Sequence, residues 1–204
     1  MIKTENFEQV EVTSPAELLA WLDAHYAQEA SVWVVTYKKS VPDKYVSTQD
    51  ILDAVIAYGW VDGIRRKVAP KANAAGEPEE RTMQLIAPRQ AQYWAKTYKD
   101  RAARLEAEGK MHEAGRAAIA RSKAAGLWDF MDDVDALITP ADLRAALGKV
   151  DGATAFFDGL SDSAKRFTLR WIKLAKTNAT RQKRIATTVA RSAAGEFVPG
   201  VRMG

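Results

Sequence analysis

Two segments near the start of the chain carry apolar residues at helical spacing. Residues 14–17 have the serine-to-glutamate spacing of a capping box, with proline at the first helical position, and predict a helix over 15–28. A second cap at Ser47 predicts a helix that runs through Tyr58. Gly59 follows directly. Since glycine readily adopts the left-handed backbone found just past a helix end, we expect a positive φ at Gly59.

Three further segments have the composition of β-strands. Residues 31–38 are rich in β-branched and aromatic side chains, and residues 61–68 and 81–87 are interpreted as the second and third strands. The connection over 69–80 contains small, proline, glycine and acidic residues, and we interpret it as a mobile loop. The strands and the two helices together predict a small N-terminal lobe over residues 1–89.

The pattern becomes helical after residue 90 and stays helical to the end. We therefore expect an α+β fold, in which a small lobe of about three strands and two helices (1–89) is followed by a helical C-terminal half (90–204), packed as one domain or two. The first helix of this half begins near residue 90, and the others are predicted over 114–125, 140–147, 153–160, 163–176 and 179–193.

The amino-acid composition excludes several kinds of chemistry and cross-linking. The 204 residues are 47% hydrophobic, enough to bury a core without covalent cross-links. Without cysteine, the chain can form no disulfide, thiolate nucleophile or cysteine-ligated metal site. Its two histidines, His25 and His112, fall at predicted helix ends, and we expect no metal and no cofactor. The sequence has no signal-peptide pattern and no long apolar stretch, so we expect a cytoplasmic protein with no transmembrane segment.

Charge is unevenly distributed, although the net charge is only +4. Residues 129–162 hold eight aspartates against two cations, whereas residues 163–204 hold ten lysines and arginines against one glutamate. We interpret the two segments as attracting each other or as solvated helix faces. Binding of an anionic partner is the alternative.

Short motifs are spread along most of the chain. They are Tyr37-Lys38-Lys39, Gly59-Trp60-Val61-Asp62-Gly63, Pro88-Arg89 leading to Trp94, Arg104-Leu105 through Gly109-Lys110-Met111 to Gly115, and Ala175-Lys176 with Thr180-Arg181 and Arg184-Ile185. Their order resembles the YdeI/OmpD-associated family, also labelled bacteriocin-protection proteins, over roughly residues 18–195. The chain departs from that family near Trp94: many members carry a serine and an asparagine there, and this chain has Gln92-Tyr93 and Thr97-Tyr98.

The resemblance implies a stress factor that protects against antimicrobial peptides or bacteriocins. The family name also links its members to an outer-membrane porin, a protein partner. It implies no reaction and assigns no catalytic residue. We therefore interpret the protein as acting by ligand or protein binding rather than as an enzyme.

Basic and aromatic side chains of the N-terminal lobe form a candidate cleft. Because successive strand residues point to opposite faces, only one of Lys38 and Lys39 can face it. Arginine guanidinium groups flanked by tryptophan side chains would bind an anionic small molecule or carboxylate. The alternative is that Asp62 forms a buried ion pair with an arginine and that the tryptophans are core. The candidate cleft residues are Lys38, Lys39, Trp60, Asp62, Arg65, Arg81, Arg89 and Trp94.

Asp62 is the only acid in this cluster. A general base normally works with a second titratable group, which the cluster does not contain. We therefore expect Asp62 to be largely buried and hydrogen-bonded to an arginine or to backbone N–H groups. An uncharacterised enzyme acting on an anionic small molecule remains the third hypothesis.

The basic C-terminal helices form a second candidate surface. The predicted helix over 163–176 has an apolar line on one side and a basic face on another. Such a face would grip nucleic-acid phosphates or lie on an anionic membrane surface. No helix-turn-helix, zinc-finger or base-stacking signature accompanies the charge. The residues of this basic surface are Arg166, Arg170, Lys173, Arg181 and Arg184.

Overall fold

The computed structural model describes residues 6–200, and the chain divides into two compact units between Asp129 and Phe130. The sequence placed this division between residues 89 and 90. The boundary lies later because Leu105 and Met111 pack into the same core as Trp60. The fold is α+β, as predicted, with a sheet in the first unit and helices making up the second.

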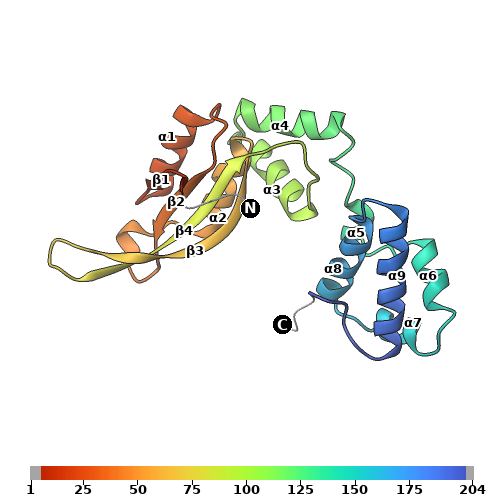
Figure 1. Ribbon diagram of the computed structural model, residues 1–204. Helices are drawn as coiled ribbons and strands as arrows, with labels where there is room; N and C mark the ends of the chain where they lie inside the picture. The colour runs from red at the N-terminus through yellow and green to blue at the C-terminus, as the bar shows by residue number, and fades with distance from the viewer. Residues whose placement is uncertain (1–5, 201–204) are drawn as a thin grey trace. The chain divides into compact units, whose positions relative to one another are not determined.

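The first unit contains a mixed four-stranded sheet with the order β1-β2-β4-β3 (Figure 1). Only β1 and β2 are parallel, and the other neighbours are antiparallel. Three of the strands correspond to predicted ones, whereas β1 is too short to show an alternating pattern and was missed. The strands are β1 (Gln9–Glu11), β2 (Val32–Tyr37), β3 (Trp60–Ala72) and β4 (Pro78–Pro88).

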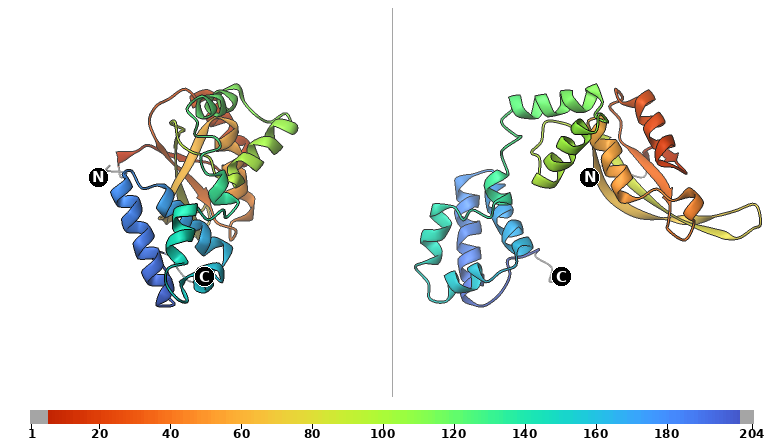
Figure 2. Two further views of the ribbon diagram at one scale, coloured as in Figure 1. Left: turned by 90° about the vertical axis from the view of Figure 1, so that its right-hand side faces the viewer. Right: turned by 180° about the vertical axis from the view of Figure 1, so that it is seen from behind.

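Strands β3 and β4 continue past the end of β2 as a two-stranded ribbon (Figures 1 and 2). The prediction of a mobile loop over 69–80 was therefore wrong. Beyond the point where Tyr37 pairs with Arg81, the ribbon is largely exposed on both faces, so no apolar alternation marks its strands. A tight turn closes it, in which the Asn73 side chain accepts two backbone N–H hydrogen bonds, each of 2.9 Å.

Helices pack on one face of the sheet and enclose the core. Val34 of β2, Ile86 of β4 and Val55 of α2 are completely buried there. Ser14 and Ser47 cap the first two helices as predicted, since each side chain accepts the backbone N–H three residues later. The helices are α1 (Pro15–His25), α2 (Thr48–Ala57), α3 (Lys96–Ala107) and α4 (Glu113–Ala124), with a short 3-10 helix, η2, at Pro42–Lys44.

Two glycines allow the end of α2 to touch the start of α4. Gly59 has a φ of +72°, as predicted, and a Cβ there would lie 2.6 Å from the backbone oxygen of Ala114. A Cβ at Gly115 would lie 2.2 Å from the backbone oxygen of Ala57. The N–H of His112 donates to the same Ala57 oxygen at 3.1 Å. A larger residue at either glycine would have to push the two helices apart.

The second unit is built from helices alone within its described residues. Leu143, Phe157 and Ile172 are completely buried and form part of its core. The four longer helices begin and end within three residues of their predicted positions, and only the short α5 was missed. The helices are α5 (Asp132–Asp135), α6 (Ala141–Leu147), α7 (Ala153–Asp158), α8 (Asp162–Lys173) and α9 (Asn178–Ala193).

Replacing Gly59 by alanine should lower the free energy of unfolding by about 2–4 kcal/mol, because a backbone clash adds to an unfavourable φ. Gly109→Ala is the matched control. Gly109 has a similar φ of +69° with open space at its Cβ position, so its loss should be only about 1 kcal/mol. Urea unfolding measures both variants. Equal losses would contradict the close contact between α2 and α4.

Candidate functional site

The structure places the candidate cleft residues at opposite ends of the sheet. Arg81 and Arg89 are eight residues apart along β4 and the position after it, which corresponds to roughly 27 Å of extended chain. Lys38 and Lys39 follow the end of β2 and lie at the Arg81 end. Trp60 pairs with Pro88 and lies at the Arg89 end. The cations therefore do not converge on one cleft.

The Arg81 end is a paired network that ties β1 to the base of the ribbon. Arg81 donates to one carboxylate oxygen of Glu11 at 2.7 Å, and Lys71 donates to the other, also at 2.7 Å. The Tyr37 hydroxyl donates to Glu11 at 2.7 Å. Burial, and then this hydrogen bond, raises the pKa of Tyr37 to about 12. Because Glu11, Lys71 and Arg81 are paired with one another, we interpret this network as structural.

The other cations near the sheet also have neighbours. Lys38 forms a salt bridge of 3.2 Å with Glu80, and the Lys39 ammonium lies over a tyrosine ring. The Arg65 Nε donates to the Gln84 side chain at 2.8 Å. None of these three contributes to the Arg89 end.

At the Arg89 end, aromatic and polar side chains form a compact cluster. Trp60 and Trp94 are buried, which confirms that these tryptophans are core. Asp62 is half-buried rather than largely buried, and it accepts a hydrogen bond from the Tyr98 hydroxyl of α3. The expected arginine partner was wrong, since Arg89 attracts Asp62 electrostatically without a hydrogen bond between them.

Tyr98 holds Asp62 from the position where the chain departs from the YdeI/OmpD-associated pattern. Burial raises the pKa of the Tyr98 hydroxyl, and the hydrogen bond to Asp62 raises it further. The hydroxyl therefore keeps its proton and acts as a donor. Tyr98 was not predicted as a site residue, because nothing in the sequence places it opposite an acid on β3.

Arg89 differs from the other cations of the first unit because it is buried without an acceptor. It is 5% exposed, and its guanidinium lies 3.9 Å from the ring centre of Trp94 and 5.3 Å from that of Tyr98. Its Nε has no hydrogen-bond partner among residues 6–200. Burial lowers the pKa of Arg89 to about 10, and attraction by Tyr98 and Asp62 offsets this only in part. A buried donor without an acceptor is unfavourable unless something else supplies one.

Arg89 lines a groove of about 440 Å³. Aromatic rings form part of its wall: His112 stacks on Tyr58 with ring centres 4.6 Å apart, and Tyr26 packs on His112 at 4.8 Å. Arg121 of α4 adds an exposed cation that has no salt bridge within the described part of the chain. Two arginines and three aromatic residues thus line one space.

The first turn of α4 forms another side of this groove. Glu113 and Ala114 line it, and the Nδ1 of His112 accepts the Ala114 N–H at 3.1 Å as the helix cap. Helix N-termini favour anions because their backbone N–H groups point outward. Glu113 contributes the one lining carboxylate, so the side chains of the groove have a net positive charge.

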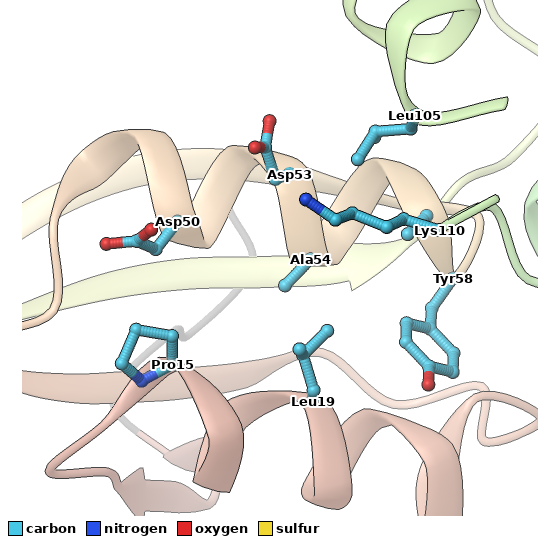
Figure 3. Close-up of a pocket in the computed structure, with 9 residues that line it drawn as sticks. Pro15, Leu19, Asp50, Asp53, Ala54, Tyr58, Leu105 and Lys110 are labelled. Carbon is cyan, nitrogen blue, oxygen red and sulfur yellow. The ribbon is translucent and has the colours of Figure 1, made fainter. Parts of the chain in front are cut away.

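A neighbouring groove of about 370 Å³ lies between α1 and α2 (Figure 3). Leu19 of α1 and Tyr58, which directly follows α2, line it from opposite sides. Its charged residues are already partnered. Asp50 completes the cap of α2, Asp53 accepts hydrogen bonds from two arginines of α3, and Lys110 pairs with a glutamate at 2.8 Å. This groove offers apolar surface rather than an unpaired charge.

The basic C-terminal surface is mostly neutralised inside the second unit. The attraction predicted between the acidic and basic segments is confirmed by side-chain pairs that join them. Of the five residues predicted for this surface, Arg170 alone has neither a salt bridge nor a side-chain hydrogen bond among the described residues. The others are engaged as Arg166–Asp135 (3.8 Å), Lys173–Asp133, Arg181–Asp142 (2.8 and 2.9 Å) and Arg184 donating to the backbone oxygen of Trp171.

The aromatic and cationic residues of the Arg89 groove that were not predicted as site residues are Tyr26, Tyr58, His112 and Arg121. Each lies at a helix end or on a helix face, where the sequence gives no sign of a shared wall. The available signal was the pair of glycines at 59 and 115, which marks a close contact between backbones.

These features define a two-unit α+β protein whose first unit carries a cationic groove with aromatic walls. Residues 10–118, more than half of the chain, match the family described as Domain of unknown function (DUF8412), and the chain belongs to this family. Residues 136–195 match the family described as Bacteriocin-protection, YdeI or OmpD-Associated. The predicted family is therefore confirmed for the helical unit, and the motif at Pro88-Arg89 falls within the other match. No curated protein and no solved structure gave a significant match.

Two further findings concern residues 6–200. No group of three or more histidine, aspartate or glutamate side chains gathers there in a way that would hold a metal ion. That part of the chain also contains no helix long and apolar enough to cross a membrane.

The hydrogen bond between Tyr98 and Asp62 should stabilise the first unit, because a carboxylate acceptor strengthens it. Tyr98→Phe and Asp62→Asn should each lower the free energy of unfolding by about 1–2 kcal/mol. The double variant should lose less than the sum of the two, since both remove the same bond. Strictly additive losses in urea unfolding would show that the two side chains are not coupled.

Proposed function

We propose that this protein is a binding protein whose first unit holds an anionic ligand through Arg89. The observation that carries the proposal is the buried Arg89 side chain, whose Nε has no acceptor among the described residues. We also propose that binding contributes to protection against bacteriocins or antimicrobial peptides. This role is the one named in the description of the family that matches residues 136–195.

The chemistry of the groove favours a carboxylate or a phosphate. A guanidinium group donates along two parallel directions, which fits the paired oxygens of both anions. Arg121 and the first turn of α4 add positive potential at the same groove. The aromatic wall of Tyr26, Tyr58 and His112 would cover an apolar or planar part of the ligand.

A catalytic role has less support. Acid and base catalysis normally uses two groups whose pKa values are driven apart by their surroundings. Asp62 already accepts the Tyr98 hydrogen bond, and the raised pKa of Tyr98 keeps that hydroxyl a donor. The cluster therefore supports binding better than proton transfer.

Nucleic-acid or membrane-surface binding through the C-terminal helices also has less support. Polymer binding draws on several unpaired cations on one face, since each phosphate contact releases counterions. Most of the cations in question are held by aspartates or by a backbone oxygen of the same unit.

The substitution Arg89→Met tests ligand binding, because it removes the charge and keeps a long apolar side chain over Trp94. Without ligand, the variant should be as stable as the wild type or more stable by about 1 kcal/mol, since a buried cation lacking an acceptor is lost. In a thermal-shift panel of carboxylates and phosphates at constant ionic strength, the wild type should melt higher with the anion that fits. Arg89→Met should lose this rise, which follows ligand affinity for the folded state.

Arg170→Met is the matched control, because Arg170 is exposed in the second unit and has no salt bridge among the described residues. Its ligand-dependent rise in melting temperature should equal that of the wild type. The proposal fails if Arg89→Met keeps the full rise, or if no anion of the panel stabilises the wild type.

Survival of cells tests the protective role. A strain lacking this protein should be more sensitive to a bacteriocin, and expression of the wild type should restore survival. If protection depends on the ligand, Arg89→Met expressed at the same level should not restore it, whereas Arg170→Met should. Full restoration by Arg89→Met would separate protection from the groove.

A further inference from the structure

A third groove lies between α4 and α3, on a face of α4 that does not line the Arg89 groove. Its volume is about 400 Å³. Small and branched side chains form an apolar floor, and the half-buried Trp128 forms one wall. The floor residues are Ala102 and Ala103 of α3 and Ile119 and Ala120 of α4.

Two ammonium groups lie over the same indole at the rim of this groove. The Nζ atoms of Lys99 and Lys123 are 5.3 and 5.0 Å from the ring centre of Trp128. A cation near an aromatic face is favourable, but two like charges at one ring repel each other unless anions lie nearby.

The acids at the rim neutralise only part of this charge. Lys99 forms a salt bridge of 3.1 Å with Asp129, and Arg116 forms one of 3.0 Å with Glu106. Lys123 has no carboxylate partner among residues 6–200. The rim therefore keeps one positive charge next to the indole and above an apolar floor.

We propose that this groove is a binding site for an anionic amphiphile, a small carboxylate with an aliphatic chain. The chain would lie on the alanines and Ile119, where burial of apolar area favours binding. The carboxylate would lie at Lys123, where it completes the charge balance of the rim. The site is separate from the Arg89 groove, since different residues of α4 line the two spaces.

Decanoate is a suitable probe, and the tryptophan fluorescence of the whole protein reports its binding. Decanoate should quench or shift the emission in a saturable way below its micelle concentration. Decanol and decyltrimethylammonium, which have the same chain and no negative charge, should bind at least about tenfold more weakly, which corresponds to loss of one charge-assisted contact. Trp128→Phe should remove most of the fluorescence change.

Lys123→Glu reverses the unpaired charge and should weaken decanoate binding at least about tenfold. Lys67→Glu is the matched control: Lys67 is exposed on β3, outside this groove, and its reversal should change the affinity less than about twofold. Both substitutions are at exposed positions, and melting curves confirm folding. Equal binding of decanoate and decanol, equal effects of the two lysine reversals, or no saturable binding would overturn the proposal.

Discussion

The contact between the end of α2 and the start of α4 organises the first unit. Two helices approach this closely only where side chains are missing, and Gly59 and Gly115 provide the two gaps. The N–H of His112 then reaches the Ala57 oxygen that ends α2. As a consequence, the Tyr58 and His112 rings stack. The position of this wall of the Arg89 groove is therefore determined by the backbone contact between the two helices.

The same contact also fixes the position of Arg89. Its backbone N–H donates to the Gly59 oxygen at 3.0 Å, so the turn that follows α2 holds the chain just after β4. Trp94 then packs below the guanidinium and donates its indole N–H to Ser122 of α4 at 2.8 Å. An arginine that is anchored at its backbone and stacked along its side chain loses little conformational freedom when an anion binds. The Arg89 side chain is therefore already held in place before a ligand binds.

The sequence predicted the local structure well, because caps, glycines and apolar periodicity act over a few residues. Ser14 and Ser47 cap their helices, and Gly59 has a positive φ after the end of α2, as the adjacent residues predicted. The sequence-based prediction was wrong where pairing between distant segments determines the structure. The ribbon over 69–80 carries no apolar pattern because neither face is buried, and its strands form their backbone ladder with each other.

The candidate site shows the same limit. The cleft residues other than Trp94 were assigned to strands or to positions near strand ends, and the register of the strands decides which of them meet. The register of β2 on β4 pairs Tyr37 with Arg81, and this places Lys38 and Lys39 at the far end from Trp60. Arg89 and Trp94 came together as expected because they are only five positions apart in the sequence. Tyr98 was missed because its acid lies on a strand 36 residues earlier.

The two units differ in how far their basic side chains are paired with acids, and the two units match different families. In the helical unit, which matches the bacteriocin-protection family, aspartates neutralise most of the basic helices. In the first unit, which matches a different family, Arg89 and Lys123 keep unpaired cationic groups beside grooves. Unpaired charge next to concave apolar surface is where a ligand gains most affinity, since both desolvation and pairing favour it. Both proposed grooves therefore lie in the first unit, outside the segment that matches the bacteriocin-protection family.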